Sequence, residues 1–139
     1  MSKNKKIIFK ELKAFSLTEV LVVLVIIGIL VLLALPNLMP LITKAKSTEA
    51  KMQLQHLYTL QKSHFYERSV YSDELEELGY EQEKLTSDGG QANYRIEIIE
   101  AGPTGFIAKA TAIADFNGNG TFNVWEIDEE KNLREITKD

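Results

Sequence analysis

The chain has no cysteine, and its 139 residues include only two histidines, three prolines and one tryptophan. Without cysteine it forms no disulfide, carries no lipid on a thiol and holds no metal through thiolates. The sequence also lacks a glycine-rich phosphate loop and a histidine placed with a plausible serine nucleophile. We therefore expect a non-enzymatic, structural role.

Positive charge is scarce outside the first 14 residues. Residues 1–14 hold five lysines and one glutamate, a net charge of +4, which leaves −8 for the rest of a chain whose total is −4. Binding to nucleic acid requires clustered lysine and arginine to neutralise phosphates. The acidic body therefore argues against a nucleic-acid partner.

Polar residues are missing from a long stretch that follows this basic start. From Val20 to Leu35 every residue is apolar or glycine, and the apolar character continues to Ile42 with interruptions at Pro36, Asn37 and Pro40. Counted from residue 15, a helix of this length crosses a hydrocarbon core of about 30 Å. The run is too long for an ordinary secretory signal, and Ala34-Leu35-Pro36 at its far end is a poor cleavage context. The simplest interpretation is an uncut signal anchor, with the basic N-terminus in the cytoplasm.

One carboxylate, Glu19, lies near the start of the apolar stretch. An ionised acid in hydrocarbon costs several kcal/mol unless it is paired, so such a residue is a functional candidate with a partner to be found. The alternative is an acid in the first turn of a helix, where the helix dipole favours negative charge.

The residues around Glu19 form a recognisable motif. Lys13-Ala14-Phe15-Ser16-Leu17-Thr18-Glu19-Val20, followed by the apolar run, closely resembles the N-terminus of type IV pilins and type II secretion pseudopilins. The resemblance implies that a prepilin peptidase cuts between Ala14 and Phe15 and that Phe15 is then N-methylated. In the family a glycine usually precedes the cut, whereas this chain has Ala14. Gly28 and Pro36 fall where the family commonly has a glycine and a helix-bending proline.

The resemblance also implies a role for Glu19 and a set of partners. The new amine of Phe15 would neutralise Glu19 within one chain or in the next subunit, which would set the axial register of a filament. Expected partners are prepilin peptidase, other copies of the chain, minor pilins or pseudopilins, an inner-membrane assembly platform and the lipid bilayer. The expected location is the inner membrane, crossed once with the head outside, and then a periplasmic or extracellular filament. Pilus and secretion pseudopilus both stay open.

The pattern predicts an α+β fold in four segments. These are a cleaved basic leader (1–14), a transmembrane and assembly helix (15–42), an amphipathic helix (43–68) and a globular head (69–139). One helix is expected from about residue 16 to residue 68, with an apolar stripe interrupted by Gln61. Alternation in the head predicts strands at about 94–101, 106–114, 122–128 and 133–137, which form a three- to four-stranded antiparallel sheet under the helix.

The sequence also predicts several local features of the amphipathic helix and the head. Asp73 to Gly79 suggests a short helix closed by the glycine, and Ala108, Ala110, Ala112 and Ala114 are expected on one strand face under the helix. His56 and His64 are eight residues apart, a spacing that does not favour a metal pair, and both are expected in solvent. Trp125 and Ile127 are expected in the core.

A second motif lies between two of these predicted strands. Asp115, Asn117 and Asn119, with Gly120 and then Glu126, match the spacing of an EF-hand calcium loop. Strands flank the loop where an EF-hand has helices, so an asparagine-glycine turn is the alternative. Ca²⁺ is the one cofactor that the sequence suggests. An uncleaved, signal-anchored periplasmic binding module, with or without calcium, is therefore the alternative to a filament subunit.

Overall fold

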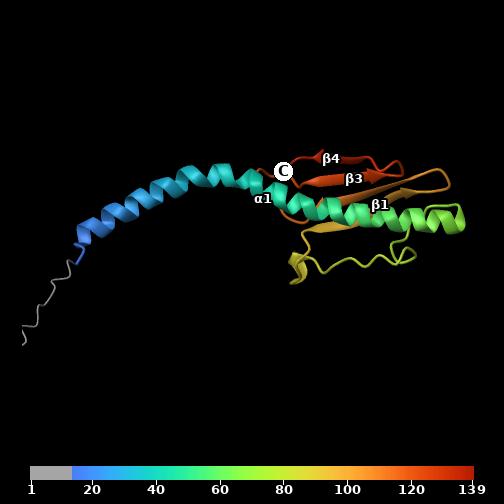
Figure 1. Cartoon of the computed structure of the whole chain (residues 1–139), viewed down its shortest axis with the longest axis horizontal. Coiled ribbons are helices and arrows are strands. Elements are labelled where there is room, and N and C mark those ends of the chain that lie inside the picture. The colour runs from blue at the N-terminus through green and yellow to red at the C-terminus, as the bar shows by residue number, and fades with distance from the viewer. Residues whose placement is uncertain (1–13) are drawn as a thin grey trace, which may run out of the picture. The chain divides into compact units, whose positions relative to one another are not determined.

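The computed structural model describes residues 14–139, and Figure 1 shows one long helix, α1, followed by a sheet. Most of the predicted leader (1–13) lies outside the described residues. Helix α1 spans Leu17–Arg68, within one residue of the expected bounds, and is helical through Pro36 and Pro40. The helix ends at Arg68; the next residue, Ser69, has a φ of 60°, and its N–H donates to the Phe65 carbonyl at 2.7 Å. The chain divides into two compact units, Met1–Pro36 and Asn37–Asp139.

The second unit contains a four-stranded antiparallel sheet in the order β1-β2-β3-β4, so every strand pairs with its neighbour in sequence. The strands are β1 (Tyr94–Ala101), β2 (Phe106–Ala112), β3 (Val124–Asp128) and β4 (Leu133–Thr137). Short turns at 102–105 and 129–132 join the outer pairs, because antiparallel neighbours need only a turn between them, and the longer loop at 113–123 joins β2 to β3. The predicted α+β class and its antiparallel sheet are confirmed.

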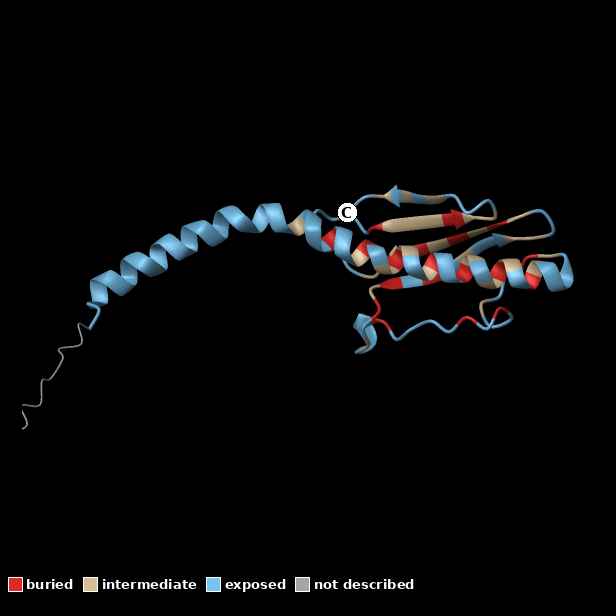
Figure 2. Cartoon of the chain, viewed as in Figure 1, coloured by how far each residue is buried: buried red, intermediate tan, exposed pale blue. Residues whose placement is uncertain are grey.

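The core of this unit lies between the sheet and the C-terminal part of α1. The buried side of the helix is a stripe with alternating spacings of four and three residues: Thr43, Ser47, Ala50, Leu54, Leu57, Gln61 and His64. Strand β2 contributes every second residue from Phe106 to Ala112. Other buried residues of the same core come from β1, β3 and the segment after α1: Tyr94, Ile96, Ile127, Tyr71, Leu78 and Tyr80. Figure 2 shows this pattern as red bands along the half of the helix that crosses the sheet.

Hydrogen bonds tie one turn of the helix to the segments that lead into the sheet. Glu49 accepts from the backbone N–H and the side-chain amide of Asn93, both at 2.8 Å. The Tyr80 hydroxyl donates to Gln53 Oε1 at 2.9 Å, and burial raises the pKa of Tyr80 to about 12. These pairs satisfy polar groups that a helix-on-sheet interface would otherwise leave without partners.

Three local predictions are wrong. Asp73 to Gly79 forms turns, not a helix, with Gly79 at φ 70°. Ala114 is exposed, since β2 ends at Ala112 before the chain enters the next loop. His64 is buried and not in solvent, because its Nδ1 lies 2.8 Å from the Val70 carbonyl. Ile127 is in the core as expected, and Trp125 is partly buried against it.

Candidate functional site

The first turn of α1 is closed by a reciprocal pair of hydrogen bonds between Ser16 and Glu19. The Ser16 N–H donates to Glu19 Oε2 at 3.0 Å, and the Glu19 N–H donates to Ser16 Oγ at 3.3 Å. This is a capping box, which satisfies two of the backbone donors left free at a helix start. The Ser-x-x-Glu spacing in the sequence is a signature of a capping box, although no capping box was predicted from it above.

This arrangement places the carboxylate of Glu19 near the predicted processing point. Ala14 and Phe15 are exposed and precede the helix, and the side chain of Phe15 is 82% accessible. The nitrogen of Phe15 is one residue before the N–H that Glu19 already binds, and consecutive Cα atoms are about 3.8 Å apart. A free amine on Phe15 is therefore within short reach of the Glu19 carboxylate.

The apolar half of α1 is exposed along almost all of its length. Every residue from 14 to 38 is exposed, and Figure 2 shows this stretch in uniform pale blue. Gly28 and Pro36 lie within it, and a Cβ placed on Gly28 would meet nothing within 4 Å. By length and composition α1 can cross a membrane. Because its apolar side chains surround the helix, burying them needs a lipid or a protein environment on all sides.

The loop at 115–121 is organised by its own side chains. Asp115 Oδ1 accepts from the N–H groups of Asn117, Gly118 and Asn119, and Oδ2 accepts from Gly120 at 2.6 Å. These bonds, the one from Gly120 first, lower the pKa of Asp115 below its ordinary value. Asn117 and Asn119 accept from backbone groups two residues later. The predicted asparagine-glycine turn thus closes through hydrogen bonds.

Glu126, the fourth proposed calcium ligand, faces other partners. It lies in β3, where its carboxylate is 3.8 Å from Lys109 Nζ and 3.4 Å from Arg134 Nη2. Among residues 14–139 no group of three or more His, Asp or Glu side chains is arranged to hold a metal. Calcium binding stays a prediction from the motif, and it would require Glu126 to leave both cations and the Asp115 oxygens to release backbone N–H groups.

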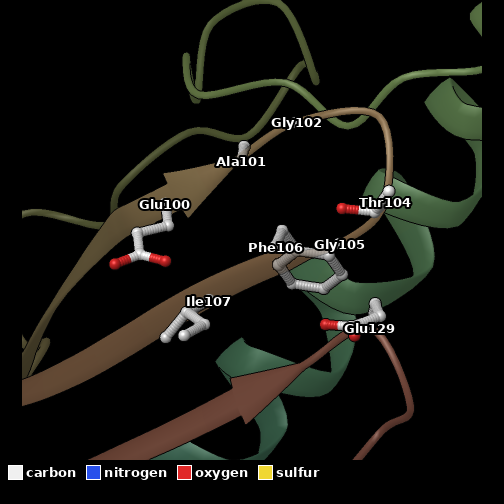
Figure 3. Close-up of a pocket in the computed structure, with 8 residues that line it drawn as sticks. All are labelled: Glu100, Ala101, Gly102, Thr104, Gly105, Phe106, Ile107 and Glu129. Atoms are coloured by element: carbon white, nitrogen blue, oxygen red, sulfur yellow. The ribbon is translucent and has the colours of Figure 1, made fainter.

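A separate hollow of about 390 Å³ lies beside the β1–β2 turn (Figure 3). Glu100, near the end of β1, and Glu129, the residue after β3, line it on different sides, and Thr104 lies in the turn between β1 and β2. A Cβ on Gly105 would lie 2.7 Å from the Glu129 carboxylate, so the glycine is what lets that side chain pack over the turn. The hollow therefore reflects packing of the turn, and no basic residue lines it.

A buried polar cluster fixes the end of α1 to the segment that follows. Gln61 Nε2 donates to the Ser72 carbonyl at 2.6 Å, and the Ser72 N–H donates back to Gln61 Oε1 at 3.0 Å. Ser72 Oγ also donates to Glu77 Oε2, which lowers the pKa of that carboxyl. Gln61, the polar residue within the apolar stripe of the helix, therefore anchors α1 to the segment that follows it.

Taken together, the described residues define a class of protein: a sheet-bearing head on a helix whose exposed apolar half starts at a capped acidic turn. Residues 13–35 match the family model described as the prokaryotic N-terminal methylation motif. The chain is also 40% identical over 84 residues, 60% of its length, to the type IV major pilin protein PilA of Myxococcus xanthus. The match spans 36% of that relative. These findings confirm the resemblance to the type IV pilin family.

Proposed function

We propose that the chain is a structural, non-enzymatic subunit of a type IV pilus-like filament. Support comes first from the apolar half of α1, whose large side chains from Leu17 to Ile42 are exposed, apart from the half-buried Met39. Full burial of one such side chain is worth about 1.5–3 kcal/mol, so the whole stretch gains on the order of tens of kcal/mol from an apolar environment. A bilayer supplies that environment before assembly, and neighbouring copies of the helix supply it afterwards.

The processing step is supported by the geometry at the start of α1. Prepilin peptidase would cut the exposed Ala14-Phe15 bond, and methylation would follow on the Phe15 nitrogen. The amine so produced neutralises Glu19 in its own chain or in the next subunit, where it sets the stagger between helices. Similarity to a major pilin favours a pilus over a secretion pseudopilus. The N-terminus is placed in the cytoplasm and the head outside, as the basic leader favours.

Mass spectrometry of the protein extracted from membranes and from sheared filaments tests the processing step. A mature species that begins with N-methylated Phe15 is expected in both fractions. An intact Met1 start in cells that contain an active prepilin peptidase would instead support the uncleaved signal anchor.

The assembly step is tested by replacing Glu19. Glu19→Ala and the isosteric Glu19→Gln should both stay in the membrane but give much less filament, because neither can pair with the amine. Thr18→Ala, a neighbouring change that keeps the carboxylate, is the matched control. Normal filament yield from Glu19→Gln would rule out charge pairing as the basis of register.

A further inference from the structure

A cavity of about 320 Å³ lies where the start of the amphipathic half of α1 meets the C-terminal end of the chain. Residues 40–51 of the helix form one wall, Trp125 of β3 forms another, and Glu135, Lys138 and Asp139 complete it. The volume is within the range of small-ligand sites. All of these residues belong to the Asn37–Asp139 unit.

The cavity lining contains lysine side chains that have no partner for their positive charge within the described residues. Lys44, Lys51 and Lys138 line it, and among residues 14–139 the ammonium groups of Lys44 and Lys138 have no hydrogen bond or ion pair. Lys51 Nζ lies 4.4 Å from the centre of the Trp125 ring. Two of the three lysines are therefore free to bind an anion.

The two carboxylates in the lining are already engaged. Glu135 Oε1 accepts from Asn123 Nδ2 at 2.8 Å. Asp139 accepts from the backbone N–H groups of Phe116 and Asn117, at 2.6 and 3.3 Å. Both acids keep their negative charge, but these hydrogen bonds hold them in place, and within the described residues neither forms an ion pair with Lys44 or Lys138. The lining therefore carries three lysines against two acidic side chains.

Two buried polar atoms in the same walls lack partners. Thr43 Oγ1 and Trp125 Nε1 are both buried and make no hydrogen bond within the described part of the chain. Nearly all buried polar groups in proteins are satisfied, so two exceptions at one cavity call for an explanation. A tryptophan N–H is a donor only, and a threonine hydroxyl can donate, so an acceptor-rich group is what both lack.

We propose that this cavity binds a phosphate group, and specifically that of a phospholipid headgroup. Phosphate offers acceptor oxygens and negative charge, which match the free lysines and the unpaired donors. Thr43 directly follows Ile42, the last residue of the apolar stretch. In a membrane-spanning helix, residues 43 and 44 lie within about 3 Å of that end along the axis, at headgroup level. The assignment to a lipid headgroup rests on the proposed function, in which α1 spans a membrane before assembly. The binding of a phosphate group does not depend on it.

Trp125 is the only tryptophan, so its fluorescence reports on the cavity directly. The full chain in a maltoside detergent is titrated with inorganic phosphate, with phosphatidylglycerol in mixed micelles, and with sodium chloride at matched ionic strength. We expect a saturable change with both phosphate probes, stronger with the lipid, and none with chloride. The double variant Lys44→Gln/Lys138→Gln should bind about tenfold more weakly or worse, and Thr43→Val a few-fold more weakly.

Lys84→Gln is the matched control, because it removes the same charge from an exposed position outside the cavity. Its titration should equal that of the unmodified chain. Equal binding by Lys84→Gln and the double variant, or no saturable response, would overturn the phosphate site. A response to inorganic phosphate alone would keep the phosphate chemistry and reject the lipid source. An intact Met1 in membranes would count against filament processing but leaves the phosphate titration unaffected.

Discussion

The two halves of α1 belong to one continuous helix and have opposite surroundings. From Leu17 to Ile42 no residue of the helix is buried, and from Thr43 to His64 a buried residue recurs every three or four positions. The first half is apolar around its whole circumference, and the second is apolar along one stripe. A stripe needs one partner surface, which the chain's own sheet supplies, whereas an all-round apolar helix needs partners on every side.

The comparison predicts that shortening an apolar side chain of α1 lowers the stability of the head only when that side chain lies in the second half of the helix. Leu54→Ala should have the largest effect, lowering the free energy of unfolding of the head by about 2–5 kcal/mol, because Leu54 is fully buried between α1 and the sheet. Urea unfolding of the detergent-solubilised chain, followed by Trp125 fluorescence, measures it. A loss below about 1 kcal/mol would mean that the helix is not held by this contact.

A polar anchor in the same stripe should matter nearly as much. Gln61→Leu removes both hydrogen bonds to Ser72 and leaves a buried N–H and a buried carbonyl without partners, at a cost of about 2 kcal/mol. The same urea titration applies. Gln55→Leu, on an exposed position of the helix, should change stability little; equal losses in the two variants would contradict the anchoring role.

A smaller and local effect is expected in the loop at 115–121. Because the pKa of Asp115 is lowered in the folded protein, its ionised carboxylate stabilises the folded state. This stabilisation is fully present above the unfolded pKa of about 4 and is lost as pH falls through the lower folded pKa. Asp115→Asn should shift the amide NMR signals of residues 117–120 at neutral pH, as acid does in the unmodified chain. Asp73→Asn, in an exposed turn, should not move them.

The smallest effect is expected in the first half of the helix. Leu24 is 58% exposed and does not belong to the buried core cluster of the head, so Leu24→Ala should change the free energy of unfolding of the head by about 0.5 kcal/mol or less. The measurement is the one used for Leu54→Ala, with that variant as its counterpart. A loss of similar size in both variants would abolish the distinction between the halves.

The sequence was sufficient to predict the helix, the antiparallel sheet and the family motif, because each depends on a local period or a fixed spacing. It was insufficient where the path of the segment after α1 and its side-chain hydrogen bonds decide the structure. His64 is buried because the segment after α1 folds back onto it, and Asp73 to Gly79 stays in turns because Ser72 and Glu77 bind each other there. Spacing alone could not show that Glu126, a residue of the predicted calcium loop, lies in β3 beside Lys109 and Arg134; calcium binding itself stays a prediction.

The strict repeat of the buried stripe limits how this protein can vary in length. Positions 43, 50, 57 and 64, and positions 47, 54 and 61, each recur every seven residues. Adding or deleting one residue within this span would rotate everything beyond it by about 100° around the helix axis and present polar side chains to the sheet. Insertions and deletions should therefore be accommodated only in the surface connections between strands, where no such phase has to be kept.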